Sequence, residues 1–134
     1  MGVDMNNFSK HGAITGAAMI AALLLGACDS QTSPNTGEAL FKKKCGTCHS
    51  LTPGAHKVGP SLAGLIGRRA GSTDFTKYKA LRDADFIWDV EKVGQWIADP
   101  KAYIDKPTAM TVKVKKASDR AAIIAYITGA ESQD

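Results

Sequence analysis

Two cysteines and a histidine stand together at residues 45–49, which read Cys-Gly-Thr-Cys-His. Two thiols three positions apart, followed at once by an imidazole, are typical of covalent attachment of a c-type haem. We therefore expect Cys45 and Cys48 to form thioethers to one haem, and His49 to bind its iron as the proximal ligand.

The Cys-x-x-Cys pattern also serves redox disulfides and zinc sites. A zinc site needs further sulfur or nitrogen ligands, but the only other cysteine is Cys28 and the only other histidines are His11 and His56. A thioredoxin-like disulfide needs a βαβ pattern around the motif, and the sequence shows none. Haem is therefore the favoured interpretation.

The second axial ligand of such a haem is predicted to be Met110, the only methionine beyond residue 27. A His/Met pair raises the reduction potential of a haem and suits electron transfer. Met110 follows a polar, irregular segment, residues 105–109, whereas a core-filling methionine is expected on an apolar helix face. His56 is the rival ligand, but it is too close to His49 along the chain to reach the opposite haem face.

The N-terminal residues 1–27 are predicted to be a lipoprotein signal peptide. A polar start with one lysine, Lys10, precedes an apolar run at 12–25 that is shorter than the ~20 residues of a spanning helix. Residues 25–28, Leu-Gly-Ala-Cys, resemble the bacterial lipobox, so we expect Cys28 to receive diacylglycerol and to become the first residue after cleavage. The alternative is ordinary cleavage that leaves Cys28 as a free thiol.

Residues 28–35 are predicted to be the lipidated cysteine and a short polar tether, followed by one domain at 36–130 and a tail at 131–134. The seven tether residues reach only ~25 Å when fully extended, so the domain is expected to work close to the membrane. Asp29 resembles the signal that retains enterobacterial lipoproteins at the inner membrane. Loss of the leader removes one lysine and one aspartate, so the formal net charge stays at +4.

The domain is predicted to be all-α, since no segment alternates convincingly as a strand does. A helix is expected from the N-cap Thr36 through Cys45, and a last helix over 119–128 between the N-cap Ser118 and Gly129. Between them the pattern predicts a loop over 53–74, a short helix at 74–83, a helix from residue 90 up to Pro100, and extended chain at 111–115.

Residues 36–130 resemble a class I cytochrome c of the mitochondrial and alphaproteobacterial monohaem type, here in a lipid-anchored bacterial form. The matching stretches are residues 57–68, 99–104 and 119–127, together with the haem motif. The resemblance implies that the N- and C-terminal helices cross, with the covalent haem in the core. Gly37 would permit close approach at that crossing, with Phe41 and Tyr126 packed across it.

The resemblance also implies how further residues bind the cofactor. The Pro60 carbonyl would accept a hydrogen bond from His49 Nδ1 and so fix the imidazole tautomer. Four further residues would lie near the haem propionates: Arg68, Tyr78, Trp88 and Thr108.

Two departures from the family pattern concern the methionine side. Trp96 stands where the family often has a tyrosine that reaches the methionine sulfur, and tryptophan offers only an N–H donor. Pro107 stands where the family usually has a glycine, so the loop before Met110 is expected to follow a different path.

The predicted function is one-electron transfer by a His/Met haem on the periplasmic face of the bacterial inner membrane. Suitable partners are a bc1-type quinol-oxidising complex and a terminal oxidase or photosynthetic reaction centre. With both axial positions filled, no enzymatic chemistry is expected. The alternatives are a fixed haem c subunit of a multi-subunit membrane oxidoreductase and a haem enzyme or gas sensor with a vacant sixth site.

Lysines are expected to surround the exposed haem edge and to steer the protein toward acidic docking sites rather than nucleic acid. The lysines concerned are Lys42, Lys43, Lys44, Lys57, Lys77, Lys101, Lys106, Lys113, Lys115 and Lys116.

Overall fold

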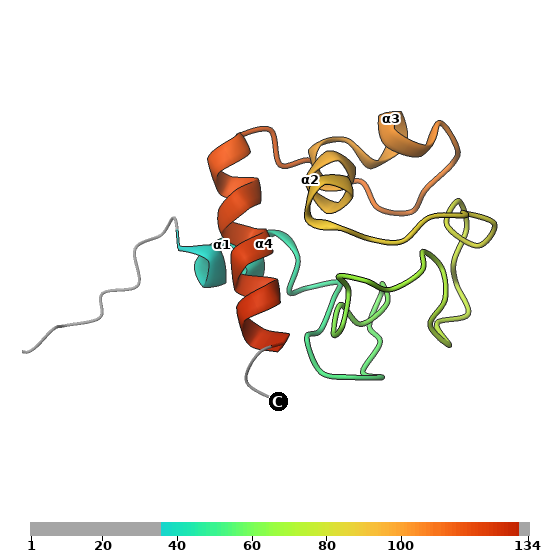
Figure 1. Cartoon of the computed structure of the whole chain (residues 1–134), viewed down its shortest axis with the longest axis horizontal. Coiled ribbons are helices and arrows are strands. Elements are labelled where there is room, and N and C mark those ends of the chain that lie inside the picture. The colour runs from blue at the N-terminus through green and yellow to red at the C-terminus, as the bar shows by residue number, and fades with distance from the viewer. Residues whose placement is uncertain (1–35, 132–134) are drawn as a thin grey trace, which may run out of the picture. The chain divides into compact units, whose positions relative to one another are not determined.

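The computed structural model describes residues 36–131, which form four helices. The predicted signal peptide, lipidated Cys28 and tether lie outside the described residues, as does nearly all of the predicted tail. The helices are α1 (Gly37–Lys44), α2 (Val90–Ala98), α3 (Pro100–Ile104) and α4 (Ala117–Glu131) (Figure 1). The described part contains no strand beyond one isolated antiparallel bridge, between Arg69 and Ile87. The all-α prediction is therefore confirmed.

Helix α1 begins at the predicted cap and packs across α4 (Figure 1). The Thr36 hydroxyl accepts a hydrogen bond from the Ala39 N–H at 3.3 Å, which satisfies one of the free donors of the first turn. The rings of Phe41 and Tyr126 meet across the crossing with centroids 5.5 Å apart. A β-carbon on Gly37 would lie only 2.1 Å from the Ala122 carbonyl oxygen. Gly37 is therefore what allows the two backbones to approach.

Substitution of Gly37 by alanine should destabilise the protein, because the backbones of α1 and α4 would have to move apart. We expect the free energy of unfolding to fall by about 1–3 kcal/mol, the usual cost of overpacking. Gly94 in α2 is the matched control, since a β-carbon there would meet only Ile124 Cδ1 at an ordinary 3.7 Å. In denaturant unfolding, the midpoint should fall for Gly37→Ala and rise for Gly94→Ala, because alanine is the better helix former where there is room for it. Equal midpoints would contradict this account of the crossing.

Helices α2 and α3 are separated by a single residue, Asp99, which ends the first and caps the second. The Asp99 carboxylate accepts from the Ala102 N–H at 3.2 Å, and Pro100 occupies the first position of α3. The sequence pattern predicted Pro100 only as the end of the preceding helix, and α3 was not predicted. An Asp-Pro pair is also a strong helix start, since proline is well tolerated at the first helical position.

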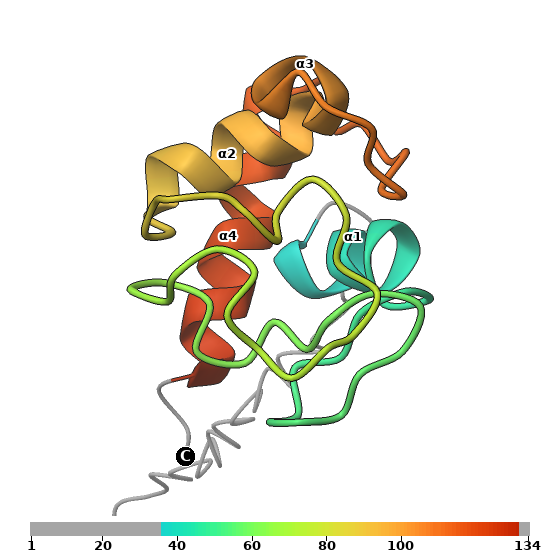
Figure 2. The same ribbon diagram turned by 90° about the vertical axis from the view of Figure 1, so that its right-hand side faces the viewer.

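The segment between α1 and α2 has no helix, and its green part lies below α2 in both views (Figures 1 and 2). Backbone hydrogen bonds of 2.8–2.9 Å fix its two arms to one another. The N–H groups of Gly67 and Ala70 donate to the carbonyls of Trp88 and Phe86, and the Trp88 N–H donates to the Arg68 carbonyl. This short ladder sets the positions of Arg68 and Trp88.

The helix predicted at 74–83 is wrong. The structure has turns there, and the Arg82 guanidinium donates to the carbonyls of Thr76 and Tyr78 at 3.1 Å. Five consecutive residues, 77–81, line the cavity described below. One face of a helix presents only every third or fourth residue, so a helix could not place all five there.

Helix α4 starts earlier and ends later than predicted. It begins at Ala117, so Ser118 lies inside its first turn rather than at its cap, and it continues through Gly129 to Glu131. A glycine inside a helix costs only about 1 kcal/mol relative to alanine, which the packing against α1 and α2 outweighs. Among the described residues, no helix has the length and apolar character that crossing a membrane requires.

Candidate functional site

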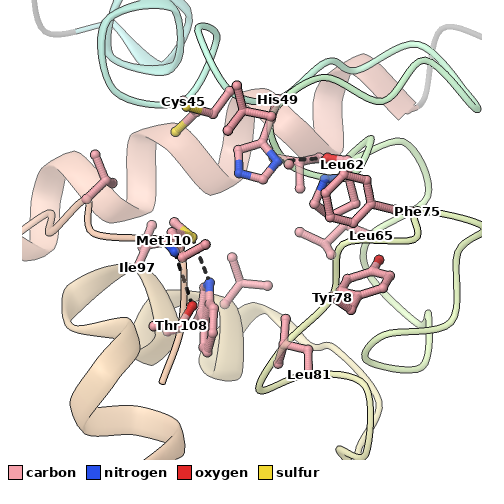
Figure 3. A pocket seen from close by; sticks show the side chains of 18 of the residues that line it. Cys45, His49, Leu62, Leu65, Phe75, Tyr78, Leu81, Ile97, Thr108 and Met110 are labelled. Atoms are coloured by element: carbon pink, nitrogen blue, oxygen red, sulfur yellow. Dashed lines mark hydrogen bonds between the residues drawn. The ribbon is translucent and has the colours of Figure 1, made fainter. Parts of the chain in front are cut away.

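A cavity of about 470 Å³ lies between the haem motif, the α1–α2 segment, α2, α4 and the loop after α3 (Figure 3). This volume is within the ~300–1,000 Å³ of typical cofactor and ligand pockets. All ten residues that the sequence analysis assigned to the cofactor line this one cavity. They are Cys45, Cys48, His49, Pro60, Arg68, Tyr78, Trp88, Trp96, Thr108 and Met110.

The backbone of Gly59 and Pro60 fixes the position of the His49 imidazole. Its Nδ1–H donates to the Pro60 carbonyl at 2.7 Å, as the resemblance implied, and this leaves Nε2 with its lone pair free. A β-carbon on Gly59 would lie 2.3 Å from His49 Cε1, so the chain passes directly against the ring. Burial lowers the pKa of His49, which keeps the imidazole neutral, the form that binds metals.

The surroundings of Cys45 do not favour redox chemistry, and the described residues offer no cluster of ligands for zinc. Cys45 is buried, and burial raises the pKa of its thiol to about 11. A thiol with so high a pKa is almost entirely protonated at neutral pH and is a poor nucleophile for disulfide exchange. Within residues 36–131 no group of three or more His, Cys, Asp or Glu side chains could hold a metal ion.

Met110 lies across the cavity from His49, and Figure 3 shows the two side chains pointing toward each other. The Trp96 Nε1–H donates to the Met110 sulfur at 3.0 Å, so tryptophan provides the donor at this position. The Thr108 hydroxyl accepts from the Met110 N–H at 3.2 Å and holds the backbone of the same loop. The Trp96 contact thus orients the Met110 thioether, and the Thr108 contact holds the Met110 backbone.

The loop before Met110 begins at a residue with a left-handed backbone conformation that is not a glycine. Helix α3 ends at Asp105, which has a left-handed φ of 47°. Asp105 is the only described residue other than glycine with a positive φ. Aspartate tolerates this conformation better than most residues, so the helix can end here without a glycine.

The rival ligand His56 lies outside the cavity. Its Nε2 is 2.6 Å from the Asp74 carboxylate, and its Nδ1 accepts from the Ser61 N–H at 2.9 Å. Since Nδ1 is the acceptor, Nε2 carries the proton and donates a hydrogen bond to the Asp74 carboxylate. Both ring nitrogens of His56 therefore have partners within the loop.

Three predicted partners of the propionates take defined places on the cavity wall. The Arg68 guanidinium donates to the carbonyls of Ala63 and Ser61 at 2.6 and 3.0 Å. The Tyr78 and Thr73 hydroxyls share a hydrogen bond of 2.7 Å. Trp88 is buried and packs edge-on against Trp96, with ring centroids 5.7 Å apart.

Most of the apolar wall was missed by the sequence analysis. Val93 and Ile97 of α2, and Ile123 and Ile127 of α4, are buried and line the cavity as pairs four residues apart. That spacing places each pair on one face of its helix, so the sequence did indicate that these faces are buried. The sequence could not show whether those faces cover another helix or a cofactor.

Two of the predicted lysines, Lys44 and Lys77, line the cavity with exposed side chains, and so does Lys79, which the sequence analysis did not single out. Lys57 donates to the Gly46 carbonyl at 2.6 Å, beside the haem motif. Lys42 pairs with Glu38.

The residues fit a covalently bound haem. The wall is mostly apolar, two thiols lie at one side, and a neutral imidazole and a thioether sulfur face each other across the space. Haem iron accepts this pair of axial ligands.

Comparison with known proteins gives one consistent result. A family profile described as "Cytochrome c" matches residues 35–131. A protein named cytochrome c from Theileria annulata is 37% identical over 101 residues, which cover 75% of this chain and 88% of the relative. One from Ginkgo biloba is 36% identical over 103 residues, which cover 75% of this chain and 91% of the relative. One from Gossypium barbadense is 39% identical over 93 residues, which cover 68% of this chain and 84% of the relative.

Proposed function

The chain belongs to the cytochrome c family, a family of electron carriers with one covalent haem c, and from this premise we propose that it is a membrane-tethered one-electron carrier. We assign the thioether bonds to Cys45 and Cys48, and the two axial positions to His49 and Met110. When bound, the haem supplies a reversible one-electron Fe(III)/Fe(II) couple.

The observation that carries this proposal is the opposed pair of His49 and Met110, each held by a hydrogen bond from behind. Two filled axial positions leave no place for a substrate, which favours electron transfer over an enzyme or a gas sensor. The Pro60 carbonyl keeps the imidazole in one tautomer. The Trp96 N–H polarises the thioether sulfur and so contributes to the reduction potential.

The proposed location is the periplasmic face of the bacterial inner membrane. It rests on the lipobox-like residues 25–28 and on the seven-residue tether that follows. Acyl chains on Cys28 would give stable anchoring, since two chains bind a membrane far more firmly than one. A tether of ~25 Å would restrict the partners to membrane complexes, such as a bc1-type complex and a terminal oxidase or reaction centre.

A spectroelectrochemical titration of the purified haem-loaded protein tests the proposal. We expect one reversible one-electron wave, and low-spin spectra in both oxidation states with the weak sulfur-to-iron band in the oxidised form. A high-spin oxidised spectrum that changes on addition of small ligands would contradict a saturated His/Met haem. Retention of the protein in salt-washed membranes, and its release by Cys28→Ala, would support the anchor.

A further inference from the structure

The segment that carries Met110 has no helix between Asp105 and Lys116. Beyond Met110 it is attached to the rest of the domain by its backbone: the Val114 N–H donates to the Ile97 carbonyl at 2.8 Å. The Arg120 guanidinium of α4 donates to the Val114 and Lys115 carbonyls at 2.9 and 2.7 Å. The loop is therefore fixed to α2 and α4 just after the methionine.

A single carboxylate connects this end of the loop to its beginning. Asp99 Oδ1 accepts from the Ala102 N–H in α3, the helix that leads into the loop. Asp99 Oδ2 accepts from Lys113 Nζ at 2.6 Å, three residues after Met110. The ion pair with Lys113, followed by the bond from Ala102, holds the pKa of the Asp99 carboxyl below its usual value. Asp99 thus touches both sides of the loop base.

We infer that Asp99 and Lys113 form a clamp across the base of the Met110 loop, and that this clamp limits how often the Met110 thioether leaves its place in the cavity. The inference rests on the proposed ligation by Met110. Both residues are positioning residues, because they act on the ligand only through the loop.

The size of the effect follows from the exposure of the pair. The Asp99 and Lys113 side chains are 37% and 47% exposed, so solvent screens their attraction. Loss of such a pair changes a local opening equilibrium by about two- to fivefold. An effect of this size would change the free energy of global unfolding only slightly, but a change of about two- to fivefold in the rate of loop opening is readily measured.

The test is the limiting rate of imidazole binding to the oxidised, haem-loaded protein. Imidazole can take the sixth position only after the thioether has left, so the rate at saturating imidazole reports loop opening. Asp99→Asn keeps a good helix cap but removes the charge, and Lys113→Gln removes the charge on the other side. We expect each variant to bind imidazole about two- to fivefold faster, and the double variant to bind no faster than either single one.

Asp89 provides a matched control at the other end of α2. Its carboxylate accepts from the Lys92 N–H and pairs with the Lys92 ammonium, as Asp99 does with Ala102 and Lys113. Asp89 caps α2, however, which does not lead into the Met110 loop. Asp89→Asn should leave the imidazole rate unchanged. Amide hydrogen exchange of residues 105–113 gives a readout that does not depend on the haem, and it should accelerate in the two clamp variants alone.

The outcomes separate the clamp from the ligation on which it rests. If Met110→Ala binds imidazole no faster than the unsubstituted protein, the proposed ligation fails and the clamp fails with it. If Met110→Ala binds faster while Asp99→Asn and Lys113→Gln match Asp89→Asn, only the clamp is overturned. Multiplying effects in the double variant would also overturn it, because the residues would then act independently.

Discussion

Replacement of Met110 by alanine is expected to lower the reduction potential by well over ~59 mV, which corresponds to more than tenfold in the one-electron equilibrium constant. Axial ligands set haem potentials over a range of about 0.8 V, and a soft thioether favours the reduced iron. Alanine leaves the sixth position to water or to an added ligand. The oxidised protein should therefore lose its sulfur-to-iron band and become high-spin or bind imidazole readily.

Val112 offers a control in the same loop, because it also lines the cavity but has no donor atom in its side chain. Val112→Ala should keep the low-spin spectrum and the sulfur-to-iron band. The assignment of Met110 as axial ligand would be wrong if Met110→Ala kept the same band and the same potential as the unsubstituted protein.

Electron delivery to a membrane partner should slow by at least tenfold as the ionic strength rises from about 0.01 to 0.15 M. Over that range the Debye length falls from about 30 to 8 Å, so attraction between exposed charges is largely screened. Lys44, Lys77 and Lys79 are exposed beside the cavity, where they can attract an acidic docking surface. Electrostatic steering of this kind raises association rates by about 10- to 1,000-fold.

Two double variants separate local steering from overall charge. Lys77→Gln with Lys79→Gln removes two charges beside the cavity. Lys115→Gln with Lys116→Gln removes two from the segment before α4; both lysines were predicted at the haem edge, but neither lines the cavity. Stopped-flow rates with a purified quinol-oxidising complex should lose much more of their salt dependence in the first pair. A flat rate over the whole range of salt, or equal effects of the two pairs, would argue against a docking face at the cavity edge.

The sequence was most informative where chemistry fixes both residue type and spacing. The order of the thiols and the imidazole at 45–49 is typical of haem attachment, and Met110 was the one methionine beyond residue 27 to propose for the far side. The crossing at Gly37 was implied by the resemblance to the family, and the structure shows why a glycine is needed there: a β-carbon would lie 2.1 Å from the Ala122 carbonyl oxygen. These features depend on covalent geometry or on a required donor atom, which the sequence records directly.

The rest depends on surroundings that no local pattern encodes. Phe75, Tyr78 and Leu81 recur at helix-like intervals of three residues, but residues 77–81 line the cavity one after another. Helix α3 has only five residues, and Pro100 serves as the end of one pattern and the start of another. The Asp99–Lys113 pair joins residues fourteen positions apart through a loop path that only the fold defines.

Intact-mass spectrometry of the denatured protein, isolated from a bacterium that matures c-type haem, tests the central assignment most directly. We expect every mature form of the polypeptide to carry the mass of one haem in addition to any acyl chains on Cys28, with no thiol at Cys45 or Cys48 available for alkylation. A polypeptide without the mass of a haem, whose Cys45 and Cys48 both react with the alkylating agent, would contradict the assignment.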